Sequence, residues 1–135
     1  MTIIKGARRT PDDYDLIERG AAVPAAADMC IIHGDDTMEP YIRRGERVYI
    51  SRRQTPAEME AGLFLYRGKV YCRQWCEDYA GGLHLLCANP ARERENLHLS
   101  RSERSRCLCL GRVLLDKKLP APVYGAGSRN ALKLS

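Results

Sequence analysis

Short apolar runs recur along the chain from residue 28 onward, and turn signals separate them. Arg67-Gly68 and Gly81-Gly82 interrupt the pattern with dipeptides that favour tight reversals of the chain. Evenly spaced short strands with little helix predict a mostly β domain, in which antiparallel strands form a small barrel or sandwich. The runs that we interpret as strands are Met29–Ile32, Arg47–Ser51, Leu63–Tyr66, Lys69–Cys76, Leu83–Cys87 and Cys107–Leu115.

Helical signals are scarce. The segment Thr55-Pro56-Ala57-Glu58 has a capping residue, then a proline at the first helical position and an acidic residue at the third. This pattern predicts the start of a short helix. Met38-Glu39-Pro40 predicts a turn.

Two flanking segments lack the strand pattern. Residues 1–27 end in a stretch of small residues around Pro24, which favours an extended linker and predicts an N-terminal arm. Residues 120–135 are rich in glycine and polar residues, so we expect a loose C-terminal tail. The predicted organisation is an arm over 1–27, a β domain over 28–119 and a tail over 120–135.

Composition excludes several classes of protein. With 135 residues, 44% of them hydrophobic and 29% charged, the chain is long enough for one globular domain and is neither fibrous nor disordered. The net charge of +5 suits an acidic or nucleic-acid partner, but the basic residues are scattered without interleaved aromatics. No apolar run approaches the ~18 residues of a membrane span, and no secretory signal begins the sequence. We expect a cytoplasmic protein without membrane association.

The six cysteines have two interpretations. In a reducing compartment they are expected to be thiols. The spacings Cys72-x3-Cys76 and Cys107-x-Cys109 do not match the paired C-x2-C of structural zinc sites, so we predict no metal and no other cofactor. Each pair falls on one face of an expected strand, where cysteine serves as a small buried hydrophobe.

One motif links the strand ending at Ile32 to the strand that begins near Arg47. The residues Gly34-Asp-Asp-Thr-Met-Glu-Pro40, the turn at Gly45-Glu46 and the strand Val48–Ile50 resemble the signature of peptidase family S24. This family includes LexA, UmuD and the C-terminal domains of phage repressors. Thr37 stands at the position of the family's catalytic serine.

A second motif follows at the spacing that the family shows. Residues 68–75 resemble the strand that carries the family's catalytic lysine, and Arg73 stands at the lysine position, 36 residues after Thr37. The stretches 83–90 and 111–113 resemble two further landmarks of the family. The resemblance covers about residues 28–116 and implies the LexA/signal-peptidase fold.

The resemblance also implies partners and a cleavage site. S24 domains form homodimers through strands near the C-terminus, which suggests residues 107–115 as a dimer edge. Their cleft receives an extended peptide, either from the protein's own arm or from a partner protein. Contact with DNA would pass through a helix-turn-helix domain, which this chain does not contain. The small-residue arm resembles that of UmuD, and places a scissile bond near Arg19-Gly20 or Ala22-Val23.

The two substitutions alter the chemistry that the family performs. There, a neutral lysine takes the proton of the serine hydroxyl, and Asp36 and Met38 here would lie in the turn that forms the oxyanion region. A threonine keeps the oxygen, whereas an arginine stays protonated and is no base. His33 is an alternative base near neutral pH. Asp35 or Asp36 is expected to pair with the Arg73 guanidinium, as a structural ion pair at the old dyad site.

The sequence therefore predicts a non-catalytic domain with a regulatory or dimerising role. It would belong to a phage-type or SOS-type transcriptional repressor, or would be a stand-alone UmuD-like protein. Two alternatives stay open. One is an active auto-protease that uses Thr37 as its nucleophile and cuts near Gly20. The other is direct nucleic-acid binding through the basic surface.

Overall fold

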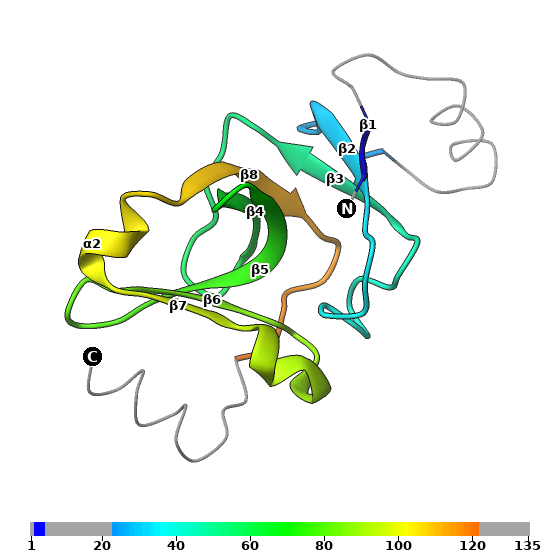
Figure 1. The fold of residues 1–135 in the computed structure, drawn as a ribbon. Helices are drawn as coiled ribbons and strands as arrows, with labels where there is room; N and C mark the ends of the chain where they lie inside the picture. The colour runs from blue at the N-terminus through cyan, green and yellow to red at the C-terminus, as the bar shows by residue number, and fades with distance from the viewer. Residues whose placement is uncertain (1, 5–22, 122–135) are drawn as a thin grey trace.

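The computed structural model describes residues 2–4 and 23–121 of the chain (Figure 1). All strand pairings are antiparallel, and the strands form one sheet in the order β1-β2-β3-β8-β4-β5-β6-β7. A 3-10 helix η1 (Pro90–Glu95) and an α-helix α2 (Arg101–Arg104) are short. The mostly β fold with little helix is confirmed. The strands are β1 (Thr2–Ile4), β2 (Met29–Ile32), β3 (Arg47–Ser51), β4 (Ala61–Tyr66), β5 (Lys69–Glu77), β6 (Leu83–Leu86), β7 (Leu97–Leu99) and β8 (Leu108–Leu114).

The sheet curls strongly around its centre but does not close (Figure 1). Among the described residues β1 pairs only with β2 and β7 only with β6, so the two end strands do not meet. The antiparallel sheet that we expected as a small barrel or sandwich is an open, curled sheet that does not close into a barrel. Each end strand has three residues, so neither offers a long row of backbone groups for closure.

Strand β8 lies in the interior of the sheet, between β3 and β4. Val113 is paired with Ile50 of β3, and Gly111 with Leu63 of β4. The register shifts between Leu63 and Phe64, which marks a β-bulge on β8. β8 pairs with β3 through residues 112–114 and with β4 through residues 108–112, and a dimer contact through residues 107–115 stays a prediction.

Gly111 of β8 lies against the end of β3. A Cβ atom at this position would lie 2.5 Å from the carbonyl oxygen of Ser51 and 2.7 Å from Cγ2 of Ile50. Such approaches are far inside van der Waals contact, so only glycine lets the two strands pair at this point.

Two clusters of buried side chains form the core. One gathers Ile31, Met38, Ile50, Leu63 and Val113 around the β2–β3–β8–β4 part of the sheet. The other surrounds Phe64 and includes Tyr66, Leu83, Leu85 and Leu99. Its Phe64 ring stacks on Trp75 at 5.8 Å between centroids. The sequence, with one Phe and one Trp, thus fills its core largely with aliphatic residues.

The six cysteines are free thiols. Cys72 and Cys76 are buried on β5, as the alternation predicted, whereas Cys107 and Cys109 are only partly buried. Burial raises the pKa of the Cys72 thiol to about 12 and that of Cys87 to about 11, so both stay protonated at neutral pH.

The predicted helix at Thr55–Glu58 is wrong. The Met59 N–H donates to the Trp75 carbonyl at 2.7 Å, and the Trp75 N–H donates to the Glu60 carbonyl at 2.8 Å. Met59 adopts a positive φ of 69°, which no helix accommodates. Pairing with the end of β5 therefore outweighs the local capping pattern, and the chain turns directly into β4.

Residues of both predicted flanking segments contact the β domain. Strand β1, from the arm, pairs with β2 through Thr2↔Ile32. At the other end Leu119 is buried against the core, and the Gln74 side-chain amide donates to the Pro120 carbonyl at 2.9 Å. Over residues 2–4 and 23–121, no helix combines the length and apolar character that crossing a bilayer requires.

Candidate functional site

Thr37 and Arg73 meet in the interior of the domain. Thr37 lies in the turn that follows β2, and Arg73 lies on β5. Both side chains are buried, Thr37 at 0% and Arg73 at 4% exposure, and Nη1 of Arg73 donates a hydrogen bond to Oγ1 of Thr37 at 3.1 Å. The two residues that the motifs single out, 36 positions apart, are thus in direct contact.

Backbone carbonyls hold the rest of the Arg73 guanidinium. Nη1 also donates to the Cys72 carbonyl at 2.8 Å, and Nε donates to the Glu95 carbonyl at 3.3 Å. The guanidinium lies 5.3 Å from the centroid of the Tyr71 ring, within range of a cation–π contact. Among the described residues no carboxylate lies within 4.0 Å of Arg73, so the predicted ion pair with Asp35 or Asp36 is wrong.

Asp35 binds Thr37 instead of Arg73. Its Oδ1 accepts the Thr37 hydroxyl at 2.6 Å and the Thr37 backbone N–H at 3.0 Å. Burial acts to raise the pKa of Asp35, but these two hydrogen bonds outweigh it and hold the pKa below its usual range. The Thr37 hydroxyl therefore donates its proton to an ionised carboxylate and accepts from a guanidinium, and it bridges two charges that do not touch.

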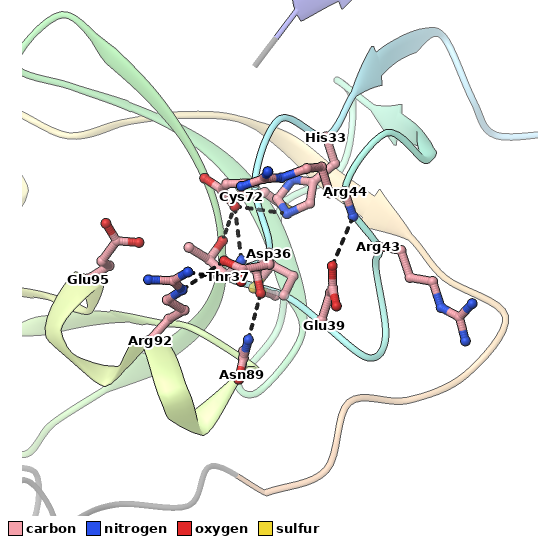
Figure 2. Close-up of polar contacts among 12 residues, drawn as sticks. His33, Asp36, Thr37, Glu39, Arg43, Arg44, Cys72, Asn89, Arg92 and Glu95 are labelled. Atoms are coloured by element: carbon pink, nitrogen blue, oxygen red, sulfur yellow. Dashed lines mark hydrogen bonds and ion pairs between the residues drawn. The ribbon is translucent and has the colours of Figure 1, made fainter.

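Asp36 fastens the turn to η1. Its carboxylate accepts two hydrogen bonds from Arg92, from Nε at 2.8 Å and Nη2 at 3.1 Å, and these bonds hold the pKa of Asp36 below its usual range (Figure 2). Asn89 adds two contacts, because its side-chain amide donates to the Asp36 carbonyl and its N–H to the Thr37 carbonyl. Helix η1, which the sequence reading missed, thus completes one wall of the site.

Met38 anchors the same turn in the core of the domain. Its side chain is fully buried, and Sδ accepts the Ala88 N–H at 3.4 Å. Its carbonyl accepts the N–H groups of Tyr41 and Ile42, so the turn predicted at residues 38–40 is confirmed. A role for Asp36 and Met38 in holding an oxyanion stays a prediction.

His33 is close to the site but is not bonded to Thr37. Its Nε2 lies within ion-pair distance of Asp35, 3.2 Å from Oδ1, but neither ring nitrogen makes a hydrogen bond to a described residue. Burial lowers the pKa of His33, despite the nearby Asp35 carboxylate. Because the Thr37 proton points to Asp35, the arrangement does not make His33 the base for Thr37.

The candidate cleavage arm is only partly described. Arg19, Gly20 and Ala22 lie outside the described residues, and Val23 is the first residue after them. Beside the turn of Thr37, a groove of about 720 Å³ runs past Pro40 and Tyr41 toward Val48 of β3 and Leu114 of β8. Its walls combine aromatic, aliphatic and charged side chains.

The resulting site is a polar chain in which the partly exposed Asp35 binds the buried Thr37 and Thr37 contacts the buried Arg73, and Asp36 and Arg92 join it to η1. No protein-family model matches this chain, and no curated protein matches it in sequence. The functional argument therefore rests on the contacts themselves.

Proposed function

We propose that this chain is a non-catalytic S24-like regulatory domain, from a phage-type or SOS-type repressor or a stand-alone UmuD-like protein. The observation that carries the proposal is the 3.1 Å contact between Arg73 Nη1 and Thr37 Oγ1. The resemblance assigns these two positions to the nucleophile and the general base of the family. An open antiparallel sheet that brings them together from distant segments supports that assignment.

The hydrogen bonds argue against self-cleavage. A general base must accept the hydroxyl proton, whereas Arg73 only donates, and a guanidinium is not deprotonated in proteins. Asp35 accepts the hydrogen bond of the hydroxyl, but a carboxylate with a lowered pKa is a weak base. Loss of general-base assistance alone slows such chemistry by about 10²–10⁴-fold.

The retained function is then binding rather than cutting. The groove beside Pro40 and Tyr41 is suited to an extended peptide, with an apolar wall from Val48 and Leu114 and charges at Glu46 and Lys117.

We also propose that the domain is a homodimer. Because β8 has a strand paired on each side, pairing between copies would use the end strands β1 or β7. Free thiols at all six cysteines support a cytoplasmic location.

The proposal is tested by restoring the family's residues. Wild type, Thr37→Ala and the double variant Thr37→Ser/Arg73→Lys are incubated at pH 7 and pH 10, and their intact masses are followed. We expect no cut in wild type, and a product cut near Gly20 in the double variant. Cleavage of wild type that Thr37→Ala abolishes would overturn the non-catalytic role. A double variant that stays whole would count against descent from a serine–lysine site.

The two alternatives gain less from the geometry. A Thr37-dependent protease would need the hydroxyl to face a free base, and it faces a bound carboxylate. Direct binding of nucleic acid needs arginines that are available to phosphates. Four arginines are already paired with carboxylates: Arg52 with Asp28, Arg92 with Asp36, Arg104 with Glu77 and Arg112 with Glu60.

A further inference from the structure

A second chain of polar contacts lies at the β6–β7 end of the sheet, away from Thr37. His84 of β6 and His98 of β7 are cross-strand partners, and their Nδ1 atoms lie 2.7 Å apart. Nε2 of His84 lies 2.6 Å from Oδ2 of Asp78, in the turn after β5. The Asp78 and His84 side chains are 3% and 6% exposed, whereas His98 is exposed.

The Asp78 carboxylate is built into its turn. Its Oδ1 accepts the N–H groups of Ala80 at 2.9 Å and of Gly82 at 2.8 Å. A Cβ atom on Gly82 would collide with Oδ2 of Asp78, so glycine makes room for the carboxylate. Burial acts to raise the pKa of Asp78, but hydrogen bonds from His84, Gly82 and Ala80 hold it below its usual range. Asp78 is therefore ionised at neutral pH.

The ionised carboxylate fixes both imidazole tautomers. A carboxylate only accepts, so the proton of neutral His84 is on Nε2 and its lone pair is on Nδ1. The short Nδ1–Nδ1 contact then requires a proton on Nδ1 of His98. Neutral His98 is left with a lone pair on Nε2, the nitrogen that takes no part in the chain of contacts.

We infer that Asp78, His84 and His98 form a second reactive centre, in which His98 Nε2 is a nucleophile toward electrophilic acyl groups and His84 is its general base. The order of contacts is that of a catalytic triad: a nucleophile bonded to a base, and the base bonded to a carboxylate that orients it. Contact of one side of the His98 ring with the protein and the neighbouring His84 lower the pKa of His98, against the opposing charge of Glu93, and the Nε2 lone pair stays available at neutral pH.

The step conserves atoms and charge within the relay. The Nε2 lone pair of His98 attacks the carbonyl carbon, a carbon–nitrogen bond forms, and the bond from carbon to the leaving oxygen breaks with its electron pair. The Nδ1 proton of His98 passes to Nδ1 of His84. The new imidazolium of His84 is held against the Asp78 carboxylate, so the acylated His98 stays neutral.

The inference is tested with diethyl pyrocarbonate as the acyl probe. The nucleophile displaces ethyl carbonate, which decomposes to carbon dioxide and ethoxide, and the ethoxide takes a proton from water. The chain has three histidines, and His33 and His84 are buried at 0% and 5% exposure. We expect one carbethoxy group per chain, located on His98 by peptide mass, and no histidine uptake in His98→Gln.

The decisive comparison is Asp78→Asn against Glu77→Gln, a matched change at the adjacent carboxylate outside the relay. The Asn amide would donate to His84 Nε2 and so invert both tautomers, which puts a proton on His98 Nε2. We expect the rate of His98 modification to fall about tenfold or more in Asp78→Asn, and to change less than twofold in Glu77→Gln. Equal rates in the two variants would reduce His98 to an ordinary exposed imidazole and overturn the inference.

A measurement on wild type covers the case in which Asp78→Asn fails to fold. Long-range ¹⁵N–¹H spectra of the imidazoles report directly which nitrogen carries the proton. We expect the proton of His98 on Nδ1 and that of His84 on Nε2. A proton on His98 Nε2 at neutral pH would overturn the inference without any variant.

Discussion

The Thr37 hydroxyl stands between Asp35 and Arg73, 2.6 Å from the carboxylate and 3.1 Å from the guanidinium. The two charged groups make no direct contact in the described structure, and one neutral hydroxyl satisfies both. The Thr37 hydroxyl is therefore a structural link, because it donates its single proton to a hydrogen bond with Asp35 and accepts one from Arg73. The stability of the turn after β2 should therefore depend on each member of the link.

Arg73→Ala should destabilise the domain. It removes hydrogen bonds to Thr37, to the Cys72 carbonyl and to the Glu95 carbonyl, and leaves a space in a buried site. We expect a loss of about 2–4 kcal/mol in the free energy of unfolding, measured by urea denaturation. Arg53→Ala, at an exposed position, is the control and should change it by less than about 0.5 kcal/mol. Equal effects of the two variants would contradict the buried link.

Thr37→Val tests the hydroxyl without changing the shape of the side chain. The substitution leaves the buried Arg73 Nη1 group and the partly exposed Asp35 carboxylate without their shared partner, and the loss at Arg73 is the costly one. We expect a cost of about 1–3 kcal/mol, because a buried polar group that loses its partner is not resolvated. Thr37→Ser keeps the hydroxyl, and should retain most of the stability of wild type. A Val variant as stable as the Ser variant would show that the hydroxyl bonds contribute nothing.

The stability of the domain should fall as the pH drops below about 6.5, the ordinary pKa of histidine. Burial lowers the pKa of His33, so the unfolded chain binds a proton that the folded chain rejects. The contribution of His33 to the free energy of unfolding is fully present above the pKa that His33 has in the unfolded chain. It is lost as the pH falls from that value toward the lower pKa of His33 in the folded chain. Unfolding by urea at pH 7.5 and 5.5 measures the difference. His33→Gln should make the free energy of unfolding differ less between the two pH values. His98→Gln should reduce that difference further, because the pKa of His98 is also lowered in the folded chain.

Gly111→Ala should be among the most destabilising single-methyl changes in the sheet. The added Cβ would meet the Ser51 carbonyl oxygen and Cγ2 of Ile50, the last two residues of β3. We expect a cost of about 1–3 kcal/mol from overpacking. Gly68→Ala is the contrast, because Gly68 has a positive φ of 76° but open space around it, so backbone strain of about 1 kcal/mol is the only penalty. Thermal unfolding of the two variants ranks them.

The Cys72 and Cys87 thiols should resist alkylation in the folded protein. Only the thiolate reacts, and burial raises the pKa of Cys72 to about 12 and of Cys87 to about 11. With iodoacetamide at pH 8, peptide mass should show both residues modified at least tenfold more slowly than in urea. Rapid labelling of Cys72 before unfolding would show that β5 opens locally.

Local patterns predicted most of the sheet. Met29–Ile32 and Arg47–Ser51 are strands with the predicted bounds, and four more strands agree within about two residues. Strand β7 was missed because three residues are too few for a periodicity. Helix α2 did carry a signal, since Ser100 and Glu103 form a capping box. At Thr55–Glu58 the local signal was present but the helix is not, because pairing of Met59 and Glu60 with Trp75 of β5 outweighs a local cap.

The site was predictable only as far as its motifs extend. The contact of Thr37 with Arg73 follows from spacing and resemblance. Which residues pair with Asp35, Asp36 and Arg73 could not be predicted in this way. Arg92, for example, binds Asp36 from a helix 56 residues away in the sequence. The Asp78–His84–His98 chain was missed because it depends on the register of β6 against β7, which is set by the packing of Leu83, Leu85 and Leu99. Polar side chains can pair in many combinations, and here the backbone register decides which pair forms.

The position of β8 has a consequence for synthesis. Strands β1–β3 and β4–β7 are contiguous in sequence, yet among the described strands the two halves of the sheet join only through β8, which is made after all of them. At translation rates of about 5–20 residues per second, the growing chain carries two unjoined sheets for about 1–3 seconds between the ends of β7 and β8, with the edges of β3 and β4 open. A ribosome stalled before residue 108 would therefore hold two folding fragments rather than one immature domain, and truncation there should release a chain prone to edge-to-edge aggregation.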